Sequence, residues 1–277
     1  MSVLDARDVT VRYGGVTAND RVSMRVGAGQ LVGLIGPNGA GKTTFIDALT
    51  GFAPLHGGSV AVAGTDVTAA GPSRRARLGL GRTFQSLELF EDLDVRSNLL
   101  VAAESPTWRD VLLDVVRPGR DRGVDAVVAE ALDRVGLADV ATALPGDLSH
   151  GQRTLVGVAR ALAMSPRVVL LDEPAAGLDT EESLALGVQL RRLVDGGIGA
   201  VLVDHDMGLV FSVCDEVHVL DFGEVIASGT PDEVRRHPDV IAAYLGSSRG
   251  VDDLGDVAST AAPPTSPPTS PPAGGTS

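Results

Sequence analysis

Lysine, cysteine and aromatic residues are scarce in this 277-residue chain, and each scarcity excludes a class of protein. The one cysteine, Cys214, excludes an internal disulfide framework and is typical of a reducing compartment. No apolar run approaches the roughly 18 residues that a membrane-spanning helix needs. The first residues lack the basic and then apolar pattern of a secretion signal. We therefore expect a soluble protein that stays where it is made, with Cys214 buried as a small hydrophobe.

Positive charge is also in short supply, since the formal net charge is −13. A sequence-independent grip on nucleic acid requires clustered Lys and Arg side chains that displace counterions. The densest basic stretch contains only Arg74, Arg75 and Arg77, followed by Arg82. We therefore predict no nucleic-acid partner.

Lysine occurs once, and its position is informative. Of the 23 basic residues, 22 are Arg and the other is Lys42. The broad guanidinium of Arg cannot replace a compact ammonium in every site. Lys42 lies in a segment with the spacing G-x-x-x-x-G-K-[ST], which reads Gly36-Pro37-Asn38-Gly39-Ala40-Gly41-Lys42-Thr43.

This segment has the context that a phosphate-binding loop requires, because it follows a predicted strand, residues 31–35, and opens a predicted helix, residues 42–51. Its glycines allow backbone N–H groups to turn inward, and the helix N-terminus adds positive potential. Lys42 would reach the β and γ phosphates, and Thr43 would hold Mg²⁺. The motif predicts ATP and Mg²⁺ as ligands. The candidate nucleotide ligands are Gly36, Asn38, Gly39, Ala40, Gly41, Lys42, Thr43 and Thr44.

Two carboxylates follow a second apolar strand, residues 168–171. Asp172 would bind Mg²⁺ through water where the strand end meets the phosphate loop. Glu173 would accept a proton from the water that attacks the γ-phosphate. Taken alone, an Asp-Glu pair after a strand is common and is usually only a polar strand end.

Hydrophobic periodicity predicts an α/β fold with a parallel sheet covered on both faces. We expect short strands between residues 3 and 32, a further strand at residues 60–67, and helices between residues 93 and 144. Strands at 168–171, 200–203 and 217–220 then alternate with a helix at 181–194. Residues 258–277 are rich in Pro, Ser and Thr, so we expect them to be disordered with some polyproline II character.

Besides the phosphate loop and the acidic pair, five further sequence elements occur in the order in which the ATP-binding-cassette ATPases have them. The chain therefore resembles that family from about residue 3 to residue 246. The resemblance gives Tyr13 the place of the aromatic residue that stacks on adenine. It gives Gln85 the place of the glutamine that senses Mg²⁺ and the attacking water, and His205 that of the γ-phosphate switch. The remaining two elements are Leu148-Ser149-His150-Gly151-Gln152, similar to the signature loop LSGGQ, and Ala176-Gly177-Leu178-Asp179, similar to the loop whose aspartate crosses the dimer interface.

The resemblance implies a RecA-like P-loop NTPase core with a small antiparallel β subdomain and an inserted helical signature subdomain. The divisions expected are 1–92, 93–154, 155–230, a C-terminal helical segment at 231–250 and the tail at 251–277. It also implies Ser149, Gly151, Gln152 and Asp179 as nucleotide contacts across a dimer, catalysis by Glu173, His205 and Gln85, and Mg²⁺ binding by Thr43, Gln85 and Asp172. Leu87, Leu89 and Phe90 would form the groove for a permease.

Two residues depart from the family's pattern. His150 replaces the first glycine of the signature loop, and Leu155 occupies a position that is usually basic. Both departures concern the surface that would cap the nucleotide of the opposite subunit.

Within the family, the chain resembles most the ATPases of branched-chain amino acid importers, through Gly81-Arg82-Thr83-Phe84-Gln85, His205-Asp206-Met207 and the C-terminal segment from Gly229 to Gly246. Such importers use two different ATPases. This resemblance implies a peripheral protein on the cytoplasmic face of the membrane, with permease subunits, a second cassette and a substrate-binding protein as partners. A homodimer remains possible. Urea or short-amide importers and the lipopolysaccharide exporter are alternatives.

The residues also bear on other classes of function. A P-loop GTPase needs the motif N-K-x-D, which a chain with Lys42 as its single lysine cannot contain. A DNA-repair cassette needs a long inserted coiled coil, and a translation-associated protein needs two cassettes. A cassette that regulates another machine stays open, although such subunits often lack the equivalents of Glu173 or His205.

Overall fold

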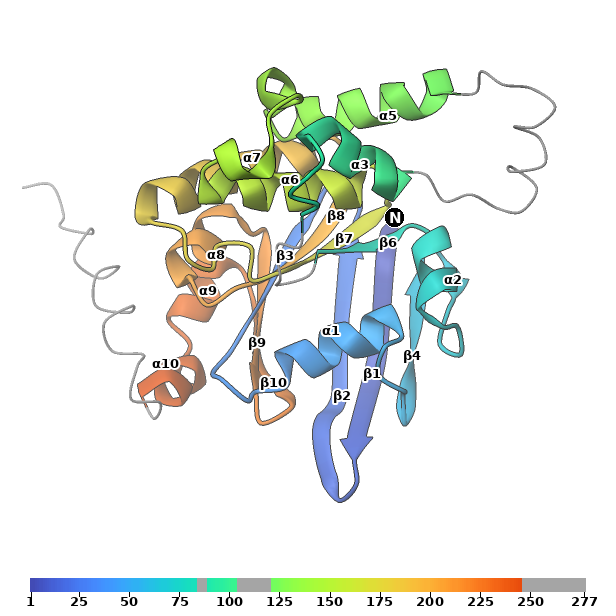
Figure 1. Cartoon of the computed structure of the whole chain (residues 1–277). Helices are drawn as coiled ribbons and strands as arrows, with labels where there is room; N and C mark the ends of the chain where they lie inside the picture. Colours follow the sequence, from blue (N-terminus) through green and yellow to red (C-terminus); the bar gives the residue numbers. More distant parts are fainter. Residues whose placement is uncertain (84–88, 104–120, 246–277) are drawn as a thin grey trace, which may run out of the picture.

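The structure, a computed structural model, describes residues 1–83, 89–103 and 121–245 (Figure 1). Gln85, Leu87 and the Pro-rich tail, which carry three of the sequence predictions, lie outside these residues. The described chain forms two sheets, one of four strands and one of six. Among the described residues, no helix is long and apolar enough to cross a membrane.

The four-stranded sheet is antiparallel, with the strand order β2-β1-β4-β5. Its strands are β1 (Ser2–Tyr13), β2 (Val16–Gly27), β4 (Gly57–Val62) and β5 (Thr65–Asp66). The prediction of short strands before residue 32 was wrong, because β1 and β2 each run for 12 residues. Their register shifts at several places, one of them beside Asp8, which has a φ of 49°. Such irregularities interrupt the alternation of apolar and polar residues from which strand length is judged.

The single strand predicted at residues 60–67 was also wrong. The chain reverses at Ala63 and Gly64, both with positive φ, and forms a tight hairpin between β4 and β5. Only the glycine of this pair signals a turn in the sequence.

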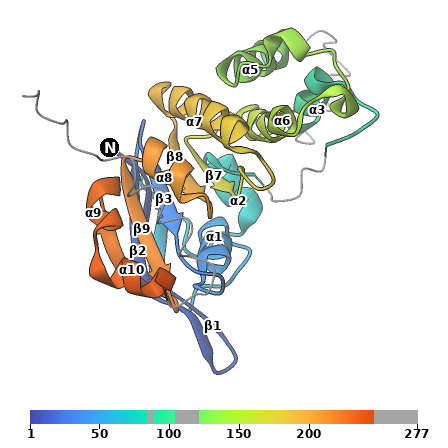
Figure 2. The same cartoon turned by 90° about the vertical axis from the view of Figure 1, so that its left-hand side faces the viewer.

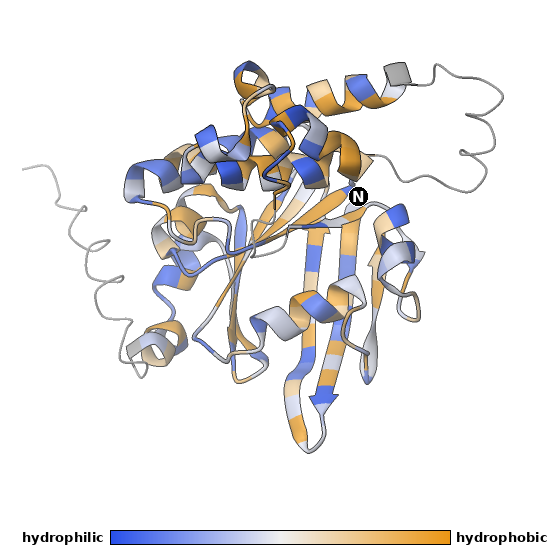
Figure 3. Cartoon of the chain, in the orientation of Figure 1, coloured by the Kyte–Doolittle hydropathy of each residue, from blue (hydrophilic) through white to orange (hydrophobic). Residues whose placement is uncertain are grey.

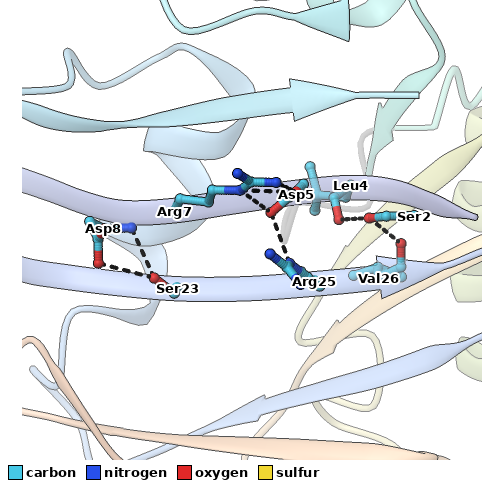
Figure 4. A network of polar contacts seen from close by, with 8 residues as sticks. All are labelled: Ser2, Leu4, Asp5, Arg7, Asp8, Ser23, Arg25 and Val26. Atoms are coloured by element: carbon cyan, nitrogen blue, oxygen red, sulfur yellow. Dashed lines mark hydrogen bonds and ion pairs between the residues drawn. The ribbon is translucent and has the colours of Figure 1, made fainter. Parts of the chain in front are cut away.

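On the polar face of the antiparallel sheet, one carboxylate receives two guanidinium groups (Figure 4). Asp5 accepts hydrogen bonds from Arg7 on the same strand and from Arg25 on β2, whose Nε lies 3.2 Å from Asp5 Oδ1. The hydrogen bond from Arg7 lowers the pKa of the Asp5 carboxyl below its usual value. Because both guanidinium groups are largely exposed, the network contributes little to stability.

The six-stranded sheet has the order β10-β9-β3-β8-β7-β6, and only the pairing of β10 with β9 is antiparallel. Its strands are β3 (Leu31–Ile35), β6 (Leu80–Arg82), β7 (Val168–Asp172), β8 (Gly199–Val203), β9 (Glu216–Asp221) and β10 (Glu224–Gly229). Every residue of β3, β7 and β8 is buried. Figure 3 shows these central strands as hydrophobic along most of their length.

Alternate residues of the central strands belong to two different cores. Leu31, Leu171 and Leu202 pack with the helices α6 (His150–Leu162), α7 (Thr180–Asp195) and α8 (Met207–Val213). Leu34, Leu170 and Val203 pack with the helix α1 (Lys42–Thr50) and the antiparallel sheet. This period of two confirms the predicted parallel sheet covered on both faces. The carboxyl ends of β3, β7 and β8 therefore meet at one edge of the sheet.

The helices are α1 (Lys42–Thr50), α2 (Pro72–Arg77), α3 (Val95–Ala103), α5 (Asp121–Arg134), α6 (His150–Leu162), α7 (Thr180–Asp195), α8 (Met207–Val213), α9 (Pro231–Arg235) and α10 (Pro238–Leu245), with 3₁₀ turns at Ala138–Val140 and Pro145–Asp147. In Figures 1 and 2, α3, α5 and α6 gather at the end of the molecule farthest from the β1–β2 hairpin. The division of the chain at residues 92, 154, 230 and 250 stays a prediction.

Candidate functional site

At two positions, the glycine-rich loop between β3 and α1 has no room for a side chain. A Cβ added to Gly36, whose φ is +151°, would lie 2.0 Å from the carbonyl oxygen of Leu220. A Cβ added to Gly41, whose φ is +100°, would lie 2.5 Å from the carbonyl oxygen of Ala18. The loop is therefore wedged between β9 and β2. Its outer residues Asn38 and Gly39 are exposed.

Lys42 folds back over this loop. Its Nζ donates hydrogen bonds to the carbonyl oxygens of Gly36, at 2.6 Å, and Pro37, at 3.0 Å. Burial lowers the pKa of the Lys42 ammonium, and the carboxylates of Glu173 and Asp172 act in the opposite direction. Thus the single lysine, the loop and the acidic pair lie in one electrostatic environment. Thr43 and Thr44 occupy the first turn of α1 directly after it.

Two contacts that support the loop were not predicted from the sequence. Asn19 is fully buried on β2, and its Nδ2 donates to the carbonyl oxygen of Gly41 at 3.2 Å. The backbone N–H of Gly223 donates to the carbonyl oxygen of Ala40 at 2.9 Å. The sequence does carry a signal for Asn19, because a polar residue at an inward position of a strand is unusual.

Asp172 ends β7 with its side chain almost fully buried. Its Oδ2 accepts a hydrogen bond from Arg82 Nη2 at 2.9 Å, and its Oδ1 is buried with no hydrogen-bond partner within the described residues. A buried carboxylate oxygen without a donor is costly unless a cation faces it. Mg²⁺ takes oxygen ligands and is commonly held by one or two carboxylates together with phosphates. Asp172, with Thr43 on α1, therefore fits such an ion.

No larger metal cage is present in residues 1–83, 89–103 and 121–245. In those residues, no group of three or more His, Cys, Asp or Glu side chains converges on one point.

Arg82 joins the acidic pair to the phosphate-loop helix. Its Nη1 lies 2.6 Å from Asp47 Oδ1 on α1, while its Nη2 reaches Asp172. The Arg82 side chain is only 11% exposed, so this bridge is largely shielded from water. The sequence points to this segment through Gln85 and gives no sign of the role of Arg82, because Asp47 and Asp172 lie 35 and 90 positions from it in the chain.

Glu173 adopts a backbone conformation that is uncommon for a residue with a side chain, with a φ of 49°. Its N–H donates to the carbonyl oxygen of Val203 at 2.7 Å, which anchors the turn to the end of β8. Such conformations carry strain and concentrate at functional sites. The side chain is half-buried beside the Lys42 ammonium.

His205 follows β8 and exposes 67% of its side chain, with Nδ1 3.6 Å from Asp204 Oδ1. The buried Asp204 connects this residue to the acidic pair. Its Oδ2 accepts from the N–H of Ala175 at 3.0 Å, and its Oδ1 accepts from the N–H groups of His205 and Asp206 at 2.8 and 2.9 Å. Burial raises the pKa of the Asp204 carboxyl, and the three donors oppose that shift.

The residues predicted to act across a dimer lie at two helix N-termini. Ser149 caps α6, where its hydroxyl accepts from the N–H of Gln152 and Gln152 Oε1 accepts from the N–H of Ser149. Asp179 caps α7 in the same way with Glu182. Both caps are exposed. Gly151 approaches α7, since a Cβ there would lie 3.6 Å from Glu182 Oε1.

Tyr13 ends β1 beside the Gly14–Gly15 turn, with 52% of its surface exposed. A cavity of about 630 Å³ lies between α6 and the ends of β6 and β7. Leu89 and Phe90, predicted to line a groove, belong to its wall, as do Asp172 and Glu173.

Comparison with known proteins agrees with this geometry. Residues 19–176, more than half of the chain, match the family described as ABC transporter, and residues 224–249 match the family described as branched-chain amino acid ATP-binding cassette transporter. The high-affinity branched-chain amino acid transport ATP-binding protein BraF of Pseudomonas aeruginosa is 36% identical over 251 residues, covering 89% of this chain and 98% of BraF. LivG of Escherichia coli K12, with the same descriptive name, is 34% identical with the same coverage.

Two further matches are informative. The lipopolysaccharide export system ATP-binding protein LptB of Escherichia coli K12 is 32% identical over 246 residues, covering 89% of this chain and 98% of LptB. The solved ADP conformation of MJ1267, an ATP-binding cassette of an ABC transporter, superposes with a TM-score of 0.79 at 28% identity, covering 89% of this chain and 100% of that one. A phosphate loop lies beside a strand-end Asp-Glu pair, and the chain aligns with these relatives over 89% of its length. The chain therefore belongs to the ATP-binding subunits of ABC transporters, and it is an ATPase.

Proposed function

We propose that this ATPase powers the import of branched-chain amino acids. The observation that carries the substrate class is the match of residues 224–249 to the branched-chain amino acid cassette family, together with the identity to BraF and LivG over 89% of the chain. These residues include α9 and α10 and lie outside the general ABC transporter match, so they support the substrate class independently of that match.

ATP is bound, in this proposal, by the loop from Gly36 to Thr44, whose inward N–H groups and helix N-terminus attract the phosphates. Tyr13 stacks on the adenine. Lys42 leaves the carbonyl oxygens of Gly36 and Pro37 and turns to the phosphates, because their negative charge attracts an ammonium more strongly than peptide oxygens do.

Hydrolysis requires a base beside the γ-phosphate, and Glu173 takes that role by accepting a proton from the attacking water. His205 donates to the γ-phosphate, and Asp204 holds its backbone in place. Thr43 and Asp172, with Gln85, hold Mg²⁺, which supplies positive charge to the phosphate oxygens when it is bound. Because Arg82 occupies Asp172 Oδ2, the buried Oδ1 is the atom left to face the ion.

A second cassette completes the site. We propose that Ser149, Gly151, Gln152 and Asp179 act on the nucleotide of the opposite subunit, since they lie at exposed helix N-termini, where N–H groups favour anions. The sequences Thr83-Phe84-Gln85 and His205-Asp206-Met207 favour a different cassette as the partner. A pair of identical chains is the alternative. The cassettes would work at the cytoplasmic face of the membrane, with permeases seated at the cavity wall near Leu89 and Phe90 and with a substrate-binding protein outside.

The test is reconstitution of the complex that co-purifies with the full chain when its neighbouring genes are expressed. Uptake of labelled leucine driven by internal ATP, a second cassette type in the complex, and loss of both uptake and hydrolysis in Glu173→Gln are the expected results. Glu181→Gln, an exposed carboxylate in the first turn of α7, is the matched control and should keep wild-type activity.

Lipopolysaccharide export is a second candidate, favoured by the 32% identity to LptB. It predicts two copies of this chain, no second cassette and no binding protein in the complex. Urea or short-amide import predicts uptake of labelled urea instead of leucine. Failure of all three cargoes to move, with hydrolysis retained, would contradict the transport proposals and favour a cassette that regulates another machine.

A further inference from the structure

His150, the residue that departs from the signature loop of the family, contacts a loop 26 residues away in the same chain. Its Nε2 lies 3.1 Å from the carbonyl oxygen of Ala176. A carbonyl oxygen can only accept, so the ring nitrogen must be the donor, which selects the tautomer with hydrogen on Nε2 or the doubly protonated ring. Glycine, the usual residue at this position, has no side chain with which to make this bond.

The loop that contains Ala176 has a glycine where the His150 imidazole packs. Gly177 has a φ of +80°, and a Cβ built on it would lie 3.2 Å from His150 Nε2, closer than an ordinary van der Waals contact. The first turn of α6 therefore packs directly against the loop between β7 and α7. His150 and Ala176 also share the wall of one cavity with Glu173.

Hydrogen bonds connect this loop to Glu173 and Asp204. The N–H of Ala176 donates to the carbonyl oxygen of Glu173 at 3.2 Å, and the N–H of Ala175 donates to Asp204 Oδ2 at 3.0 Å. Asp204 in turn holds the N–H of His205. Ala176 is thus hydrogen-bonded both to Glu173, the base proposed for this chain's own ATP, and to His150 in the signature loop.

We propose that His150 is a positioning residue that couples the two halves of the machine within one chain. It ties the signature segment, which acts on the partner's ATP, to the loop that begins at Glu173, which acts on the chain's own ATP. When one end of this unit is placed by nucleotide, the other is placed with it. This inference rests on the roles proposed above for Ser149 and Glu173.

The hydrogen-bond donor can be separated from the bulk of the ring by three substitutions. His150→Gln retains a donor at similar reach, His150→Leu retains bulk without a donor, and His150→Gly restores the usual residue of the family. Each is measured in the reconstituted complex of the full chain, as ATP hydrolysis over a range of ATP concentrations.

We expect kcat to fall about two- to tenfold in His150→Leu and His150→Gly, the loss expected for one hydrogen bond. KM for ATP should stay within about twofold, because the phosphate loop is untouched, and His150→Gln should keep most of the wild-type kcat. If His150→Leu fails to fold, His150→Gly still decides the matter, since the position is exposed and begins a helix that Ser149 caps.

Equal kcat across the series would overturn the proposal, and so would an equal loss in all three variants or a rise in KM with kcat unchanged. Glu173→Gln is measured alongside to separate this inference from the proposed site. Loss of hydrolysis there, with equal kcat across the His150 series, overturns the role of His150 alone. Full hydrolysis in Glu173→Gln overturns the proposed site and this inference with it.

Discussion

Arg82 Nη2 lies 2.9 Å from Asp172 Oδ2, in surroundings where the two side chains are 11% and 2% exposed. This buried ion pair fixes the carboxylate that we propose as a Mg²⁺ ligand, and its second arm to Asp47 ties the end of β7 to α1. One arginine therefore links the helix that follows the phosphate loop to the acidic pair.

Arg82→Leu should destabilise the nucleotide-free chain by about 3 kcal/mol, because it leaves the Asp172 carboxylate buried without a partner. The free energy of unfolding in urea measures this. The double variant Arg82→Leu with Asp172→Leu should recover most of the loss, since the buried carboxylate is then gone and Asp47, which also loses Arg82, is 32% exposed and can be solvated. Arg96→Leu, which breaks a pair whose side chains are about half exposed, is the control and should cost under about 1 kcal/mol. Equal losses in Arg82→Leu and Arg96→Leu would contradict the buried-pair argument.

Gly41→Ala should reduce ATP affinity more than tenfold, because the new Cβ would lie 2.5 Å from the carbonyl oxygen of Ala18 and displace the phosphate loop. Gly64→Ala is the matched control. Gly64 also has a positive φ, +79°, but has nothing within 4 Å of the added Cβ. It should lower stability by about 1–2 kcal/mol, the cost of a left-handed conformation, and leave nucleotide binding unchanged. Binding of a fluorescent ATP analogue measures affinity, and equal weakening in both variants would remove the loop's steric role.

The elements that carry the candidate site lie where local sequence predicts them, whereas the roles of the site residues stay predictions. The strand, glycine loop and helix from Leu31 to Thr50 carry their own signals, and parallel strands bring the ends of β3 and β7 to one edge. Arg82 and Asp204 were missed because their roles arise from contacts with residues 35 and 90, or 29, positions away. Neither residue differs, in its own sequence neighbourhood, from an ordinary polar strand end.

Lys42→Arg should weaken ATP binding about tenfold or more, as expected for the loss of a charge-assisted hydrogen bond, although the charge is conserved. The Nζ reaches two carbonyl oxygens at 2.6 and 3.0 Å inside a narrow loop, where a planar guanidinium has no equivalent position. Lys42→Ala should weaken binding at least as much. Arg74→Lys, the reverse exchange at an exposed site on α2, should have no effect. Wild-type affinity in Lys42→Ala would show that this lysine does not contact the phosphates.

Stability should fall as the pH drops below 6.5, partly because of His218 on β9. Burial lowers the pKa of the His218 imidazole below its ordinary value of 6.5, although Glu216 Oε1, 3.0 Å from Nε2, opposes the shift. Below pH 6.5 the unfolded chain therefore takes up a proton that the folded chain binds less readily, so protonation favours unfolding. The stabilisation is present above pH 6.5 and is lost as the pH falls through the lower, folded-state pKa.

The measurement is the free energy of unfolding between about pH 5 and pH 8. His218→Leu should flatten the decline on the acid side, whatever its effect on stability at neutral pH, because the slope reports only the difference in bound protons. An unchanged slope in His218→Leu would mean that this imidazole binds its proton equally well in the folded and unfolded chains, and that burial on β9 does not govern it.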